Sequence, residues 1–121
     1  MDNDLAITDC CPGFGSVAKY VINSTIEAAL DVESMAASST KVFILEVMGR
    51  HAGWIAASSA VAKESYPHAP DLILLPEITF KERDFLKRVK DTVASKGFCV
   101  VVASEGIKNN KGRFIAESGL K

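Results

Sequence analysis

Three short apolar runs, separated by longer stretches with helical spacing, constrain the fold of this chain more than any other feature. The runs cover residues 42–47, 72–75 and 98–103 and consist almost entirely of apolar and β-branched side chains. Such runs are typical of strands that are buried on both faces of a sheet. Because strands that alternate with helices form parallel sheets covered on both sides, the sequence predicts an α/β fold, a parallel-sheet three-layer α/β/α domain.

The stretches around the runs have the spacing of amphipathic helices. One helix is expected over residues 16–30 with Ser16 as its N-cap, and an Ala-rich helix over residues 55–63. Thr79 and Glu82 have the spacing of a capping box at the start of a third helix, which Gly97 is suited to end. These helices would supply the outer layers of the domain.

The composition fits one globular domain and gives no sign of a nucleic-acid or membrane partner. The chain has 121 residues, 48% of them hydrophobic, and a net charge of −1. No apolar run approaches the roughly 20 residues of a membrane span, and the N-terminus has no signal-peptide pattern. The three cysteines lack metal-ligand spacing, which is typical of proteins in a reducing compartment. We therefore expect a cytoplasmic protein that binds neither nucleic acid nor a membrane.

Polar residues follow each apolar run at the point where a strand would end. Right-handed crossovers bring the carboxyl ends of parallel strands to one edge of the sheet, where open α/β sheets bind ligands. An arginine there offers a planar fork for a phosphate, and glutamates accept hydrogen bonds from sugar hydroxyls. A helix start after the first turn would add free backbone N–H groups that favour an anion. The sequence thus predicts a site for a phosphorylated, hydroxyl-rich small molecule, formed by Met48, Gly49 and Arg50, by Pro76 and Glu77, and by Ser104, Glu105 and Gly106.

An ordinary strand-to-helix connection with a surface arginine is the alternative interpretation. Taken alone, the turn at residues 48–50 does not distinguish a binding site from an ordinary connection. The glutamates at the other two strand ends favour the binding site.

Asp2 and Asp4 form a second unusual feature at the start of the chain. Two carboxylates two residues apart can divide the work of phosphoryl transfer. One takes a proton from the attacking hydroxyl, and the other orients the water shell of Mg²⁺. An acidic N-terminal segment can equally be a solvated tail, and the pair alone does not decide between these interpretations.

Taken together, these segments resemble the phosphofructokinase family. The resemblance covers essentially the whole chain and rests on Asp-Asn-Asp-Leu at 2–5, Thr-Asp at 8–9, Gly-Phe-Gly-Ser at 13–16, Glu-Val-Met-Gly-Arg-His-Ala-Gly-Trp at 46–54, Leu-Pro-Glu at 75–77 and Ser-Glu-Gly at 104–106. It implies a catalytic-loop segment at residues 1–13 and the fructose 6-phosphate-binding α/β domain of a two-domain fold at residues 14–121. It also implies an allosteric enzyme of glycolysis that transfers a phosphoryl group to the C1 hydroxyl of fructose 6-phosphate, which gives fructose 1,6-bisphosphate.

The family pattern implies roles for single residues. The first aspartate of its Thr-Ile-Asp-Asn-Asp motif, Asp2 here, is the general base on the sugar hydroxyl, and the second, Asp4, lies near the Mg²⁺ ion. Lys41, where many relatives have arginine, would reach the sugar phosphate of a neighbouring subunit, so a homo-oligomer is implied. Contacts to fructose 6-phosphate are implied for four further residues, Met48, Gly49, Arg50 and Glu105.

Departures from the family pattern matter as much as the matches. Met1 stands where the motif has isoleucine. The glycine-rich donor-binding turns that precede the motif in the family, and the later His/Arg segment of the sugar-phosphate site, do not occur in this sequence. We therefore expect an internal fragment without the donor-binding domain, inactive by itself in phosphoryl transfer.

The sequence allows more than one phosphoryl donor and more than one function for such a fragment. Residues 10–15 and 50–54 look more like pyrophosphate-dependent members of the family, which favours pyrophosphate over ATP. An ATP-dependent phosphofructokinase is the alternative within the family. A non-catalytic module that binds sugar phosphate or drives assembly is the alternative outside it, because helices severed from their neighbours leave apolar faces uncovered.

Overall fold

The computed structural model describes residues 7–119 of the chain. Its strands are β1 (Val42–Val47), β2 (Leu72–Leu74) and β3 (Cys99–Ser104). Its helices are α1 (Phe14–Met35), α2 (Trp54–Ser58), α3 (Ala62–Ser65) and α4 (Glu82–Lys96), with 3₁₀ turns η1 (Ser59–Val61) and η2 (Ala116–Gly119). The Ala-rich stretch is therefore helical, as predicted, but a 3₁₀ turn separates its two α-helical parts.

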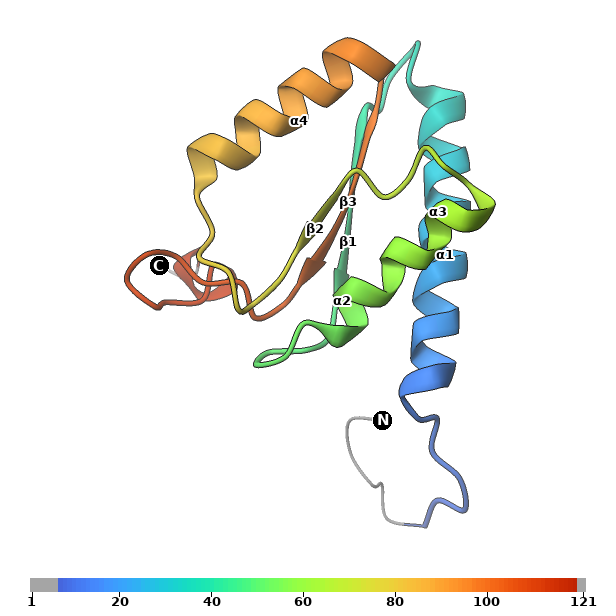
Figure 1. Ribbon diagram of the computed structural model, residues 1–121, viewed down its shortest axis with the longest axis vertical. Coiled ribbons are helices and arrows are strands. Elements are labelled where there is room, and N and C mark those ends of the chain that lie inside the picture. Colours follow the sequence, from blue (N-terminus) through green and yellow to red (C-terminus); the bar gives the residue numbers. More distant parts are fainter. Residues whose placement is uncertain (1–6, 120–121) are drawn as a thin grey trace.

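The three strands pair in parallel in the order β1-β3-β2. Helix α1 and the α2–α3 segment lie on one face of the sheet, and α4 lies on the other (Figure 1). This arrangement confirms the predicted three-layer α/β/α fold. The register pairs Val47 with Ser104 and Leu74 with Ala103, so the three strands end close to one another.

The central strand β3 carries the core, and all six of its residues are buried. Val100 and Val102 belong to the apolar clusters on the α1 face of the sheet. On the opposite face, Cys99 and Val101 pack against three apolar side chains of α4, namely Phe85, Val89 and Val93. The prediction of a strand buried on both faces is confirmed for β3.

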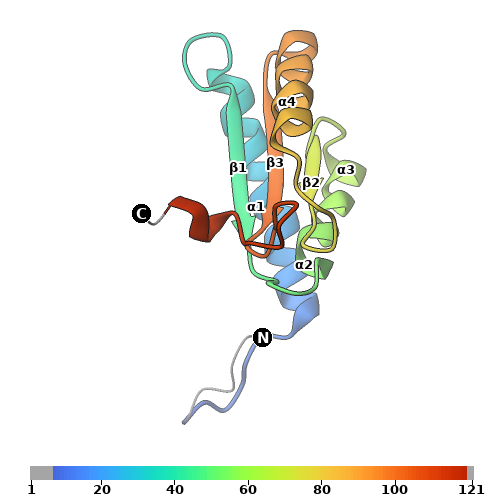
Figure 2. The ribbon, with the colours of Figure 1, turned by 90° about the vertical axis from the view of Figure 1, so that its left-hand side faces the viewer.

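The edge strand β1 differs from β3, and the prediction that both of its faces are buried is wrong. Phe43, Leu45 and Val47 pack on the α1 face. Ile44, on the other face, is 53% exposed, and Val42 is exposed as well. The reason is that α4 packs over β2 and β3 and leaves this face of β1 uncovered (Figure 2).

Helix α1 is longer than the sequence predicts. It begins at Phe14 with Gly13 as its N-cap, so Ser16 lies inside the first turn and the N-cap assigned to it is wrong. The helix also continues to Met35, because Val32 extends the apolar stripe that packs on the sheet.

Helix α4 begins and ends in different ways. Its N-cap is Lys81, whose side chain makes no capping bond, so the capping box expected at Thr79 does not form. Its C-cap is Gly97 with a left-handed φ of +94°, which confirms the predicted stop.

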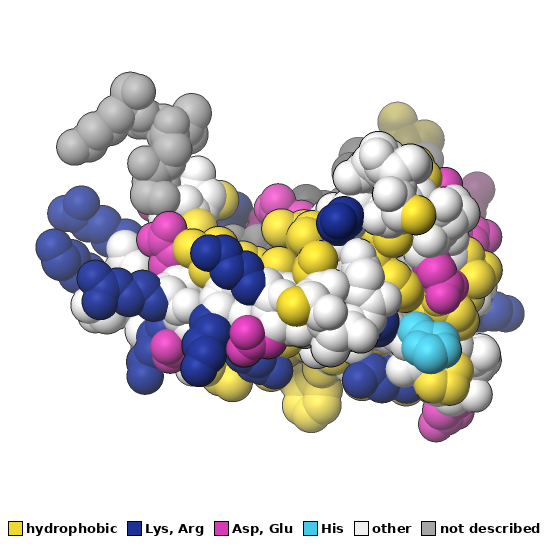
Figure 3. All heavy atoms as spheres, turned by 90° about the horizontal axis from the view of Figure 1, so that it is seen from above, with side chains coloured by type: hydrophobic (Ala, Val, Ile, Leu, Met, Phe, Trp, Pro, Cys, Tyr) yellow, Lys and Arg dark blue, Asp and Glu magenta, His cyan; other side chains and the backbone are white. Residues whose placement is uncertain are grey.

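The outer face of α4 is strongly polar, as its pattern predicts. Lys87, Arg88 and Lys90 are exposed, and basic side chains gather on the side of the molecule that carries α4 (Figure 3). Within residues 7–119, none of the helices has the length and apolar character needed to cross a lipid bilayer.

Candidate functional site

The loops that follow the three strands meet at the carboxyl end of the sheet, as predicted. Residues 48–53 follow β1, residues 75–81 follow β2, and residues 105–115 follow β3. Figure 1 shows these loops together at the lower edge of the sheet. Glu105 N donates a hydrogen bond to Val47 O at 2.9 Å, which joins the first loop to the third.

Gly49 is the centre of the turn after β1, and side chains hold both of its backbone polar groups. Its φ of +123° lies in the region that favours glycine. Its N–H donates to Glu105 Oε1 at 3.4 Å, and its carbonyl accepts a hydrogen bond from Ser104 Oγ at 2.6 Å. Ser104 at the end of β3 and Glu105 directly after it therefore hold this turn, and the second oxygen of Glu105 has no hydrogen-bond partner among the described residues.

Gly106 brings the third loop into direct contact with the first. A Cβ atom at this position would lie 2.0 Å from Arg50 O and 2.5 Å from Arg50 C. Only a residue without a side chain lets the two backbones pass this closely. The position of the Arg50 peptide is therefore set by the loop after β3.

Glu77 ties the second loop to the first. Its Oε1 accepts a hydrogen bond from Gly53 N at 2.7 Å, at the start of α2. The anion at this helix start is therefore the protein's own Glu77 carboxylate. The prediction that a ligand anion binds at the helix start is wrong for the Gly53 N–H group.

Arg50 is an exposed cation at this edge, and it forms no ion pair with the described residues. Its Cζ lies 6.0 Å from the ring centroid of Phe114, and Lys108 Nζ lies 4.9 Å from the same centroid. The single ion pair in the described part of the chain joins Lys96 to Asp71 at the other end of the sheet. Arg50 therefore keeps its N–H donors for a ligand.

Phe114 reaches this edge although no sequence pattern singles it out. Residues 108–114 fold back as an antiparallel turn, in which Lys108 forms a bridge with Phe114. Asn109 Oδ1 closes the turn by accepting hydrogen bonds from Lys111 N and Arg113 N. The Asn-Asn-Lys-Gly segment at residues 109–112 is typical of a turn, but such a segment does not indicate the edge to which the chain returns.

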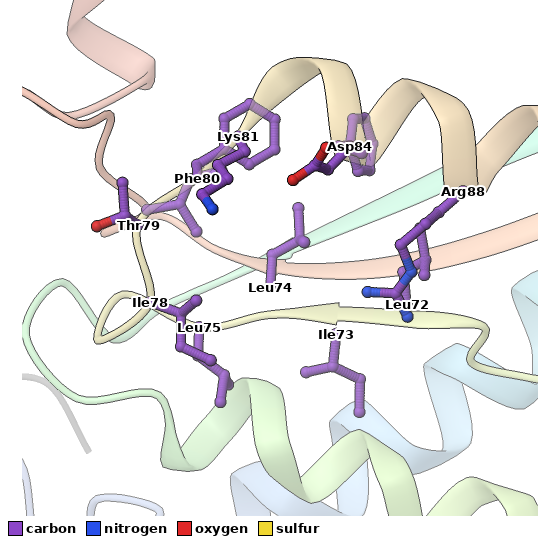
Figure 4. Close-up of a pocket in the computed structure, with 12 residues that line it drawn as sticks. Leu72, Ile73, Leu74, Leu75, Ile78, Thr79, Phe80, Lys81, Asp84 and Arg88 are labelled. Atoms are coloured by element: carbon purple, nitrogen blue, oxygen red, sulfur yellow. The ribbon is translucent and has the colours of Figure 1, made fainter.

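Three hollows among the described residues lie near the strand ends, and one of about 890 Å³ lies between the start of α4 and the loop after β3. An apolar groove of about 490 Å³ runs between α1 and β1 and includes Met48. A pocket of about 280 Å³ lies between β2 and α4, where Lys81, Asp84 and Arg88 surround an apolar floor (Figure 4). The pocket between β2 and α4 is separate from the residues at the carboxyl end of β1 and β3, because neither Arg50 nor Glu105 lines it.

Three of the predicted site residues are not placed at this edge. Lys41 precedes β1 at the amino end of the sheet, a full strand away from Met48. Asp2 and Asp4 lie outside the described residues. A contact between Lys41 and a ligand at the carboxyl end therefore requires a second copy of the chain.

The described residues do not fit a metal ion. No three His, Cys, Asp or Glu side chains in the described part of the chain form a group that could hold one. Glu77 and Glu105 each accept a backbone N–H instead.

Two side chains with raised pKa values lie at the amino end of the sheet. Burial, together with a hydrogen bond from the phenol to Glu33 Oε2, raises the pKa of Tyr66 to about 12. Burial also raises the pKa of the Cys99 thiol to about 11, and the charge of Asp71 adds to this shift. Both groups are therefore protonated at neutral pH.

Comparisons with known proteins give consistent matches over nearly the whole chain. The sequence profile of the family described as Phosphofructokinase matches residues 1–120. The pyrophosphate–fructose 6-phosphate 1-phosphotransferase of Methylococcus capsulatus is 58% identical over 121 residues, which are 100% of this chain and 29% of the relative. The ATP-dependent 6-phosphofructokinase 2 of Clostridium perfringens is 36% identical over 116 residues, which are 95% of this chain and 29% of the relative.

A solved structure gives the same result. The crystal structure of the pyrophosphate-dependent phosphofructokinase from Marinobacter aquaeolei matches with a TM-score of 0.77 and 62% identity, and the match covers 89% of this chain and 28% of that chain. The chain thus spans less than a third of the length of these relatives.

Proposed function

The chain belongs to the phosphofructokinase family, and we propose that it carries the fructose 6-phosphate-binding part of a pyrophosphate-dependent phosphofructokinase. Such an enzyme transfers a phosphoryl group from pyrophosphate to the C1 hydroxyl of fructose 6-phosphate, which gives fructose 1,6-bisphosphate. We place this reaction in glycolysis.

The observation that carries the proposal is Arg50, which has no ion-pair partner among the described residues and lies beside Glu105 at the carboxyl end of the sheet. A guanidinium can bind a phosphate through two parallel N–H···O bonds. One oxygen of Glu105 holds Gly49, and the other can accept a hydrogen bond from a sugar hydroxyl. Met48 and Gly49 would complete the contact, since Gly49 has no side chain to hinder the sugar.

The proposed acid–base and metal roles rest on the family pattern. Asp2 would take the proton from the C1 hydroxyl as the phosphoryl group arrives. Asp4 would help to hold Mg²⁺, which offsets the phosphate charge when bound. Lys41 would add a point charge to the sugar phosphate of a neighbouring copy in a homo-oligomer.

Pyrophosphate is the favoured donor because of the names of the relatives. The relative from Methylococcus capsulatus, at 58% identity, is named for pyrophosphate, whereas the ATP-dependent relative from Clostridium perfringens is 36% identical. ATP is the alternative donor. A non-catalytic assembly module is a second candidate function, favoured by the exposed face of β1 at Val42 and Ile44.

Titration of the chain with fructose 6-phosphate, followed by NMR of the backbone amides, tests the proposal. We expect the amide signals of Gly49 and Gly106 to shift as ligand is added, and these shifts to reach a plateau when the site is saturated. Arg50→Ala should weaken the affinity by at least about tenfold, because a hydrogen bond to a charged group contributes about 1.5–3 kcal/mol.

Arg83→Ala is the matched control, since Arg83 is exposed on α4 and takes part in no ion pair with the described residues. This variant should bind with the affinity of the parent chain. Equal affinities of the parent and Arg50→Ala would contradict the role of Arg50. A parent chain that binds no fructose 6-phosphate would refute the proposed function.

A further inference from the structure

We propose that Ser104 is a positioning residue that fixes the turn carrying Arg50, an inference that rests on the proposed sugar-phosphate site. Ser104 is the last residue of β3 and is only 1% exposed. Its side chain is therefore shielded from a bound sugar phosphate. Any effect of Ser104 on binding must pass through the residues that it holds.

The Ser104 hydroxyl joins two loops through a single atom. Its Oγ donates to Gly49 O at 2.6 Å and accepts a hydrogen bond from Gly106 N at 3.0 Å. A hydroxyl can act as donor and acceptor at once, and here both capacities are used. The turn after β1 and the turn after β3 therefore cannot move independently.

Ser104 is the stronger of the two anchors on Gly49. The bond from Gly49 N to Glu105 Oε1 measures 3.4 Å, longer than the usual 2.9–3.0 Å of N–H···O bonds. The bond from Ser104 Oγ measures 2.6 Å. Glu105 can thus turn toward a sugar hydroxyl while Ser104 keeps the turn in place.

Loss of this hydroxyl should move the turn. Without it, Gly49 O and Gly106 N lose their partner, and Gly106 is buried. A buried backbone group without a hydrogen bond is costly, so the two loops would separate to admit water. The Arg50 peptide, which is in contact with Gly106, would move with them.

Spectra and titrations of Ser104→Ala and Ser104→Thr test the inference. We expect Ser104→Ala to shift the amide signals of Gly49 and Gly106 in the free chain and to weaken fructose 6-phosphate binding about tenfold. Ser104→Thr keeps the hydroxyl and should restore both signals and, within about threefold, the affinity. Rescue by threonine separates the hydrogen bonds from a general loss of stability.

Ser59→Ala is the matched control. Ser59 is fully buried, and its hydroxyl donates to Ala56 O at 2.6 Å, away from the loop after β3. This variant loses a buried hydroxyl as well, but it should keep the parent signals of Gly49 and Gly106 and the parent affinity.

Each result supports or overturns the role of Ser104. Parent-like Gly49 and Gly106 signals in Ser104→Ala would overturn it, and so would equal shifts in Ser59→Ala. If the added methyl group prevents Ser104→Thr from folding, the spectra of the two alanine variants still decide. A parent chain that binds no sugar phosphate would refute the proposed function alone, because the spectra of the free chains test the hold on the turn without ligand.

Discussion

The two ends of the sheet use their charged side chains in opposite ways. At the amino end, Lys96 Nζ lies 2.6 Å from Asp71 Oδ1, and both side chains are largely buried, with 21% and 17% exposed. At the carboxyl end, the described residues offer no ion-pair partner to Arg50, Glu77 or Glu105. The two glutamates accept only backbone N–H groups.

This difference assigns the charges at the amino end of the sheet to stability and those at the carboxyl end to the proposed binding. A charge that is already paired inside the molecule holds elements together but offers little to a ligand. A charge held only by the backbone, or by nothing, keeps its bonding capacity for a ligand. Substitutions at the amino end should therefore change stability, and charge substitutions at the carboxyl end should change binding.

The largest effect is expected at the carboxyl end, where backbone contact rather than charge sets the structure. In Gly106→Ala, the new Cβ would lie 2.0 Å from Arg50 O, so two backbones must separate. We expect the free energy of unfolding to fall by about 3 kcal/mol, as for severe overpacking. Urea denaturation measures the change.

Gly15→Ala is the control for this prediction. Gly15 lies in the first turn of α1, and a Cβ there would meet nothing within 4 Å. Its unfolding midpoint should stay the same or rise, because alanine favours helix over glycine by up to about 1 kcal/mol. Equal midpoints for the two variants would show that the loops after β1 and β3 do not touch as described.

A pair of matched carboxylate-to-amide substitutions addresses the comparison of charges directly. Asp71→Asn leaves Lys96 without its ionic partner and should lower the free energy of unfolding by about 1–2 kcal/mol. Glu105→Gln, which also retains an oxygen for its backbone N–H, should change it by less than about 0.5 kcal/mol. The affinity for fructose 6-phosphate should change in the opposite order, with a larger loss in Glu105→Gln than in Asp71→Asn. A larger loss of stability from Glu105→Gln than from Asp71→Asn would remove the contrast between the two ends.

Much of the fold can be predicted from the sequence, because the signals involved are local. The run at residues 98–103 identifies β3 to within one residue, and Gly97 marks the end of α4 through its left-handed backbone. The exposure of Ile44 could not be predicted in this way. Its run is apolar apart from Glu46, and the path of α4 across the sheet decides which strand is covered.

The same limit applies to the candidate site. Parallel strands bring Arg50 and Glu105 to one edge, and that rule needs only the order of strands and helices. The bond of Glu77 to Gly53, the two bonds of Ser104 and the approach of Phe114 depend on contacts between loops that are far apart in sequence. No local pattern encodes such contacts.

A pH dependence of stability is also expected at the amino end. The pKa of Tyr66 is about 12 in the folded chain, above the usual 10, so the folded state holds the phenol proton more tightly than the unfolded state. The resulting stability is complete below pH 10 and is lost as the pH rises to 12. Tyr66→Phe should remove this part of the alkaline loss, which urea midpoints of both proteins at pH 10 and pH 12 would show.

The ionisation of Tyr66 can also be followed directly. Tyr20→Phe leaves Tyr66 as the sole tyrosine, so the tyrosinate absorbance then reports on it alone. Glu33→Gln in this background removes the negative charge that faces the phenol and should lower the pKa of Tyr66, although burial, the larger cause, should keep it above 10. A titration centred at 10 in the Tyr20→Phe protein itself would mean that Tyr66 is solvated and that the amino end is less tightly closed than its contacts indicate.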